Sequence, residues 1–236
     1  MLKELRTESS GNAKDDPPRL EAGDHLDQPT FHRLYEAMPP GFRAELIEGV
    51  VIVPSPLRND HADIHGLVMG WLFNYRLGTP GVRPLDNASL KLPPLDEPQP
   101  DASLVIDPEY GGQTTIERGY RTGAPELIVE VAASSASYDL HSKFERYQKI
   151  GVQEYLVVVL RDAEVRWFAA RGGVFQPLLA SPGGVFRSSV FPGLWLDAHA
   201  LFADDATALV TTLNQGLASR AHVSFVKKLK ARRGKT

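Results

Sequence analysis

Cysteine is absent from the 236 residues of the chain. Thiol nucleophiles, disulfides, iron–sulfur clusters and cysteine-ligated zinc all need its sulfur, so each of these chemistries is excluded. Any metal bound by side chains must therefore use oxygen or imidazole ligands. The absence of cysteine also agrees with a reducing compartment.

Long apolar runs are absent as well. No stretch approaches the roughly 18 consecutive apolar residues of a membrane helix. Residues 1–16 are polar with mixed charge, unlike the basic and then apolar start of a signal peptide. We therefore expect a protein without membrane segments, located in the cytoplasm.

Basic residues are outnumbered by acidic ones outside the end of the chain. The sequence has 26 Lys and Arg against 29 Asp and Glu, and six of the basic residues lie in the last ten positions. The acidic remainder argues against an extended basic groove for nucleic acid, although it permits a small site whose carboxylates are offset by bound cations. Two interpretations of the basic tail stay open: a disordered, solubilising end, or a weak contact to phosphates.

The length of 236 residues suffices for one substantial domain or at most two small ones. Residues 1–28 combine polar residues and paired prolines with few large apolar groups, so we expect a flexible arm. We expect the main domain over residues 29–203, followed by a C-terminal helix and the basic tail over 204–236.

Hydrophobic periodicity and turn residues indicate an α/β domain. A short helix capped by Thr30 is followed by a hairpin over 44–54, with Glu48 and Gly49 at its turn. The strand, helix and strand over 126–160 predict a βαβ unit with a parallel pair in a mixed sheet. The other expected helices are 60–77, 137–150 and 198–218, and the expected strands are 82–92, 102–106, 126–132, 154–160, 164–170, 174–179 and 184–189.

Two carboxylates occupy positions where the pattern predicts burial. Glu130 interrupts the apolar run 127–132, and Asp101 follows Pro100 at the start of the apolar run 102–106. Burying an unpaired carboxylate costs several kcal/mol, so such a group is either neutralised or binds a cation. Together the two favour oxygen-ligated Mg²⁺ or Mn²⁺, although a Pro-Asp pair by itself is also an ordinary turn element.

The helix expected next along the chain supplies a cation. At about 100° per residue, Leu140, Phe144 and Tyr147 form one apolar stripe with Lys143 at its edge, whereas Lys149 falls on the opposite side. Lys143 can therefore extend along the stripe and bring its ammonium group toward the sheet. The alternative is an ordinary surface lysine.

Two histidines open the long helix. His61 and His65 share a face at the i, i+4 spacing of two-histidine zinc sites. The zinc-protease signature also has a glutamate directly after the first histidine, where this sequence has Ala62. A zinc hydrolase is thus a weaker hypothesis, because solvated histidines beside helix N-terminal acids explain the pattern as well.

Five stretches of the sequence together match a known pattern: AELIEGVVIVPSP (44–56), HADIHGLVMGWL (61–72), PQPDASLVI (98–106), GAPELIVEVAASSASYDLHSKFERYQKIGVQEYLVV (123–158) and VFRSSVFPGLWLD (185–197). Their order resembles the PD-(D/E)XK nuclease superfamily. More narrowly, the chain is similar to the bacterial "putative restriction endonuclease" branch, long described as a domain of unknown function. The resemblance covers residues 29–203, and its most specific part is the fourth stretch.

The resemblance implies a restriction-endonuclease-like core, with a mixed central β-sheet flanked by helices. It places the metal ligands and catalytic carboxylates on Asp101, Glu130 and Glu48, the last of these from the first hairpin. The backbone carbonyl of Val131 is implied as a further metal ligand.

The resemblance also implies a catalytic lysine. The superfamily's lysine usually stands two residues after the glutamate, at the position of Ala132 in this sequence. In this branch the following helix supplies the lysine, and Lys143 matches. His61 falls on the branch's histidine at the start of the long helix, and Tyr147 is a further candidate on the helix of Lys143.

The function that the resemblance implies is a metal-dependent endonuclease, which hydrolyses phosphodiester bonds of DNA with Mg²⁺ or Mn²⁺. Nucleic acid is then the expected partner, and a homodimer would suit palindromic sites. The alternative is a catalytically inactive module that keeps the nuclease fold and binds DNA or protein.

Overall fold

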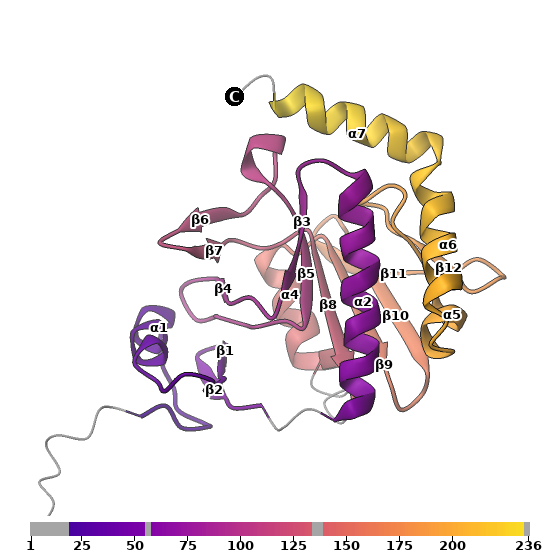
Figure 1. Cartoon of the computed structure of the whole chain (residues 1–236). Coiled ribbons are helices and arrows are strands. Elements are labelled where there is room, and N and C mark those ends of the chain that lie inside the picture. The colour runs from indigo at the N-terminus through magenta and orange to yellow at the C-terminus, as the bar shows by residue number, and fades with distance from the viewer. Residues whose placement is uncertain (1–18, 55–57, 134–138, 234–236) are drawn as a thin grey trace, which may run out of the picture.

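The computed structural model describes residues 19–54, 58–133 and 139–233 (Figure 1). Within these ranges, no helix is long and apolar enough to cross a membrane. The helices are α1 (Gln28–Glu36), α2 (Asn59–Gly78), η1 (Pro108–Tyr110), η2 (Asp139–Lys143), α4 (Phe144–Ile150), α5 (Ala198–Phe202), α6 (Ala206–Leu217) and α7 (Arg220–Arg233). The strands are β1 (Glu45–Ile47), β2 (Val50–Ile52), β3 (Val82–Asp86), β4 (Leu90–Lys91), β5 (Ala102–Ile106), β6 (Thr115–Glu117), β7 (Tyr120–Thr122), β8 (Leu127–Ala132), β9 (Glu154–Val159), β10 (Glu164–Arg171), β11 (Val174–Leu178), β12 (Val185–Arg187) and β13 (Trp195–Asp197).

The central sheet has six strands in the order β11-β10-β9-β8-β5-β3. β8 and β9 are parallel, and the other neighbouring pairs are antiparallel, which confirms the predicted βαβ unit and the mixed sheet. The expected strand 82–92 is wrong as a single element. The chain turns at Asn87, where φ is 46°, so β4 joins β7 and β6 in a separate sheet.

Both faces of the central strands are covered, as their continuous apolar runs predict. α2 lies across one face, where Trp71, Leu72 and Tyr75 belong to the main core (Figure 1). A second core contains Tyr147 of α4 and Tyr155 of β9. Polar side chains of these strands therefore lie in a protein interior, where an unpaired charge is costly.

The N-terminal elements form a small core of their own. Leu46 and Val51 of the hairpin pack there with Phe31 of α1. The hairpin turn lies at Glu48 and Gly49 as predicted, and both residues have positive φ, 52° and 79°. Such angles at both central residues are typical of the two-residue turns that match the twist of a hairpin.

The predicted arm over residues 1–28 is wrong for its last part. Residues 1–18 lie outside the described residues, but Leu20 is buried in the N-terminal core because its side chain finds apolar partners there. The cap of α1 is also corrected: it is Asp27, whose carboxylate accepts the N–H of Thr30, and not Thr30 itself.

The basic end of the chain is helical as far as Arg233. α7 buries Leu229 and His222, and Arg233 forms an ion pair with Glu109 of η1. The interpretation as a disordered end is therefore wrong for residues 220–233, because their inward side chains find partners on the domain.

Glu154, at the start of β9, is fully buried, and both of its carboxylate oxygens accept hydrogen bonds. Oε1 accepts the N–H and the hydroxyl of Ser189 at 2.7 Å and the N–H of Val190 at 3.1 Å, and Oε2 accepts the hydroxyl of Ser188 at 2.6 Å. Burial raises the pKa of Glu154, although these bonds favour its charged form. The hydrogen bonds to this carboxylate thereby connect the loop after β12 to the central sheet.

We expect Glu154→Ala to lower the free energy of unfolding by about 2–4 kcal/mol, because buried donors lose their acceptor. Glu164→Ala is the control: its side chain is about half exposed on the neighbouring strand and forms a surface ion pair with Arg166, so we expect a change below about 1 kcal/mol. Urea unfolding followed by tryptophan fluorescence measures both variants. Equal stability of the two would contradict the role given to Glu154.

Candidate active site

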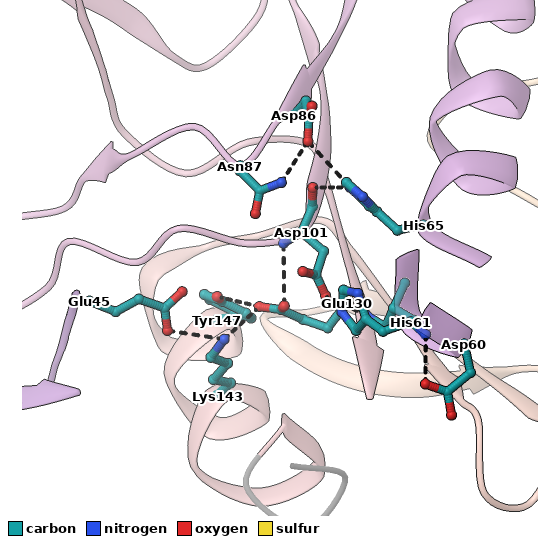
Figure 2. Close-up of polar contacts among 11 residues, drawn as sticks. Glu45, Asp60, His61, His65, Asp86, Asn87, Asp101, Glu130, Lys143 and Tyr147 are labelled. Carbon is teal, nitrogen blue, oxygen red and sulfur yellow. Dashed lines mark hydrogen bonds and ion pairs between the residues drawn. The ribbon is translucent and has the colours of Figure 1, made fainter. Parts of the chain in front are cut away.

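Two adjacent strands bring the predicted carboxylates together. β5 and β8 are antiparallel with Ala102 opposite Val129, so Asp101, just before β5, lies beside Glu130 and Val131. The N–H of Val131 donates to Oδ2 of Asp101 at 2.8 Å, and the N–H of Asp101 donates to Oε2 of Glu130 at 3.4 Å. Figure 2 shows the two carboxylates side by side. Residues from two separate strands thus form one acidic site.

The helix after β8 supplies the cation. Lys143 is the last residue of η2, and its ammonium nitrogen lies 2.9 Å from Oε1 of Glu130. The hydroxyl of Tyr147 donates to the same oxygen at 3.0 Å. Lys143 and Tyr147 are buried whereas Lys149 is exposed, as the helical spacing predicts. Lys143 therefore points toward the sheet (Figure 2).

The first hairpin contributes Glu45 to the site and not Glu48. Oε2 of Glu45 lies 3.2 Å from the ammonium nitrogen of Lys143, and Oε1 accepts the N–H of Gln99 at 2.9 Å. The structure does not bring the predicted Glu48 to this cluster, because the residue occupies the hairpin turn, where its side chain is exposed to solvent. Side-chain alternation along β1 could have indicated Glu45 from the sequence. Leu46 faces the N-terminal core, so the side chain of the adjacent Glu45 faces the opposite side of the strand.

Two histidines of α2 contact Asp101. Nε2 of His61 lies 3.2 Å from Oδ2 of Asp101, and Nε2 of His65 lies 2.9 Å from the carbonyl oxygen of Asp101. His65 also lies 3.3 Å from Oδ1 of Asp86. Both Nε2 atoms face Asp101 rather than a shared metal position, so the zinc hypothesis gains no support. The contact of His65 with the backbone of Asp101 depends on how α2 packs against the sheet. The sequence spacing of His61 and His65 does not predict this packing.

The surroundings of Asp101 favour its ionised form. Burial raises the pKa of this carboxyl group. The hydrogen bonds from His61 and the N–H of Val131, with the positive charges of His61 and Lys143, outweigh burial. The pKa of Asp101 therefore lies below its usual value, and the group is an anion at neutral pH.

The chemistry of the donors suits a hard divalent cation. The ammonium group of Lys143 contacts Glu130 and Glu45, and the carboxylate of Asp101 contacts His61, so three carboxylates face two cationic groups and the cluster carries excess negative charge. Across the described residues, no three histidine, aspartate or glutamate side chains converge as a ready-made metal cluster. The fit rests on Asp101 and Glu130, and Mg²⁺ is commonly held by one or two carboxylates with water completing its shell.

The stretch that contains all of these residues matches a known family. The family model Uma2, described as "Putative restriction endonuclease", matches residues 28–199. The chain belongs to the Uma2 family. This match confirms the resemblance inferred from the sequence and places the protein in a nuclease family of the PD-(D/E)XK type.

A solved structure has the same fold as this Uma2 protein. A protein from Anabaena variabilis ATCC 29413, described as "a putative nuclease belonging to DUF820", aligns with a TM-score of 0.59 at 16% identity. The alignment covers 72% of this chain and 96% of that chain. At this identity the likeness concerns the fold alone, and it confirms the predicted α/β core. None of the curated proteins matches the sequence.

The pKa of Asp101 provides a test of the Uma2 site geometry. Because its folded pKa is depressed, ionised Asp101 stabilises the fold at neutral pH, and this contribution is lost as pH falls through the folded pKa. In His61→Ala we expect the pKa of Asp101 to rise, so that the acid-side loss of stability begins at a higher pH. Carboxyl-carbon NMR titration of the metal-free protein measures the shift.

The control for this titration is His199→Ala, which removes an exposed histidine of α5. We expect it to leave the pKa of Asp101 unchanged. A titration of Asp101 that is the same in the wild type and in His61→Ala would contradict the role given to His61.

Proposed function

We propose that this Uma2 protein is an endonuclease that hydrolyses phosphodiester bonds of DNA with the help of Mg²⁺ or Mn²⁺. The observation that carries the proposal is the convergence of Lys143, Glu130 and Asp101 at one end of the central sheet. Adjacent carboxylates can hold a divalent cation, and a neighbouring ammonium group can stabilise charge on a phosphoryl oxygen.

Asp101, Glu130 and the backbone carbonyl of Val131 would hold the metal. When bound, such an ion lowers the pKa of a water molecule and offsets the charge of the scissile phosphate. The depressed pKa of Asp101 keeps this ligand ionised. All three donors are oxygens, which agrees with a chain that lacks cysteine.

The other residues of the site would contact the phosphate or position the side chains that do so. Lys143 would orient the attacking water or stabilise a phosphoryl oxygen, an effect of roughly 3 kcal/mol on the barrier for a well-placed donor. Glu45 positions the ammonium group of Lys143, and Tyr147 donates to the Glu130 oxygen that this ammonium group contacts. His61 orients the carboxylate of Asp101.

DNA is the proposed substrate because the family's description names a restriction endonuclease, a class of enzyme that cleaves DNA. Attack by water needs no covalent intermediate, and the acidic character of the chain implies a small, local contact with the cleaved strand. A cytoplasmic location and a homodimer stay predictions.

Nicking of supercoiled plasmid in Mg²⁺ tests the proposal. The double variant Asp101→Asn with Glu130→Gln keeps the side-chain volumes and removes two ligand charges, so we expect cleavage to fall by about 10²-fold or more. The matched control is Asp204→Asn with Glu117→Gln, which makes the same charge change at exposed positions. We expect the control to cleave at the wild-type rate.

Calorimetric titration with Mn²⁺ distinguishes a lost metal site from a lost fold. We expect binding by the wild type and the control but not by the double site variant, with unchanged circular dichroism in all three. Equal cleavage by the three proteins would overturn the assignment. Absence of Mn²⁺ binding by the wild type would favour the catalytically inactive module.

The corrected hairpin residue gives a second test. Glu45→Gln removes the charge that positions Lys143, so we expect the single-turnover cleavage rate to fall by about tenfold or more. Glu48→Gln makes the same chemical change three residues away on an exposed turn, and we expect the wild-type rate. A larger loss in Glu48→Gln than in Glu45→Gln would reverse the correction.

A further inference from the structure

α7 carries positive charge on its exposed surface. At about 100° per residue, Arg220 and Lys227 lie opposite Leu229, and Lys228 and Lys230 lie on its two flanks. All four are exposed, whereas Leu229 is buried. These four residues are termed the basic ridge. The helix sequence RAHVSFVKKLKARR contains no acidic residue that would offset their charge.

Contacts between α7 and the rest of the domain fix the orientation of this helix, so that the basic ridge faces solvent. Nδ1 of His222 lies 2.8 Å from the carbonyl oxygen of Leu217, and its Nε2 lies 3.0 Å from the hydroxyl of Thr79. Near the other end of α7, Nε of Arg233 lies 3.3 Å from Oε2 of Glu109. The basic ridge is therefore a fixed feature of the surface rather than a loose tail.

α7 lies at the end of the sheet where β3 begins (Figure 1), whereas β5, which is antiparallel to β3, begins next to Asp101 at the opposite end. β5 begins beside Asp101 and ends at Ile106, shortly before η1, which contacts α7 through Glu109. Five residues of strand span roughly 17 Å. The ridge is thus too far away to contact a phosphate held at Asp101, and any contact with substrate must involve phosphates outside the cleaved bond.

A hollow of about 830 Å³ lies between the two ends. Its lining includes Ala88 and Ser89, just beyond β3 on the side of the active site, and Pro108 and Glu109 of η1 beneath α7. The acidic residues in this lining, Asp107 and Glu109, are both paired with arginines. The surface between the active site and the ridge is recessed, and its acidic charges are offset, so a polyanion can lie along it.

We propose that the basic ridge binds the phosphate backbone of the nucleic-acid substrate at a distance from the cleaved bond. This inference rests on the proposed nuclease function and adds a second contact surface to it. From residue 220 to residue 230 the helix is about 15 Å long, so its cations meet an extended row of phosphates. Such contacts supply affinity without sequence information.

A nucleic acid fits the ridge better than a lipid surface does. Interfacial helices bind membranes through a large apolar side together with their basic residues. On α7 the exposed large apolar side chain is Val223, and the buried apolar side already packs on the domain. The ridge therefore offers charge without the apolar area that insertion needs.

The salt dependence of DNA binding tests this proposal. A fluorescent duplex of about 30 base pairs, roughly 100 Å long, is titrated with the full chain in EDTA, so that no cleavage occurs. Lys227→Ser with Lys228→Ser removes two cations, and each lost phosphate contact makes the log–log salt slope shallower by about 0.9. We expect the slope to fall by about 1.8 and the dissociation constant to rise about tenfold or more at low salt.

The matched control is Arg33→Ser with Arg171→Ser, which removes two exposed arginines from α1 and β10. It makes the same change in net charge, and we expect the wild-type slope. Combining the ridge variant with Asp101→Asn should multiply the separate fold-changes in affinity, whatever their direction, because distant sites act independently.

An unchanged slope in the ridge variant, or an equal change in the control, would overturn the proposal. Ridge-dependent binding to anionic phospholipid vesicles without any effect on DNA binding would also overturn it. These outcomes are separate from the nuclease assay: cleavage with a ridge that does not bind DNA contradicts only this inference. Ridge-dependent binding without cleavage contradicts only the proposed function.

Discussion

The ion pair between Lys143 and Glu130 is the interaction on which the site depends. The two side chains are 7% and 5% exposed, and removing Lys143 would leave the buried carboxylate of Glu130 without its cation, at a cost of several kcal/mol. Their pairing holds the helix after β8 against the sheet. Because Glu45 contacts the same ammonium group, the N-terminal hairpin is held there as well. Segments that are distant in the sequence thus meet around one charge.

Buried carboxylates at the two ends of the sheet have different roles. The oxygens of Glu154 accept bonds from Ser188, Ser189 and Val190, so this group is satisfied within the protein and contributes to stability. Asp101 and Glu130 belong instead to a cluster in which carboxylates outnumber the lysine. That excess negative charge suits a bound cation, which would reconcile an acidic chain with the proposed nucleic-acid substrate.

Local patterns predict much of the fold. β5 covers the predicted residues 102–106, and the parallel pair of β8 and β9 follows from their apolar runs. Helical spacing also predicts that Lys143 faces the sheet while Lys149 faces solvent. These predictions succeed because burial on one side of an element imposes its period on the sequence. The structure places the predicted hairpin acid Glu48 outside the cluster and buries Leu20 of the predicted arm, because both outcomes depend on which elements pack against each other.

The sequence by itself determined the chemistry available to this protein: no thiol, carboxylates in apolar strands, a lysine on the following helix and a basic end. The tertiary structure alone decided that Glu45 rather than Glu48 faces Lys143, and that the basic end forms a helix at the end of the sheet opposite the start of β5. The physical reason is that the spacing of residues specifies which side chains share one face of an element. Contacts between elements depend on their packing, which no local spacing encodes.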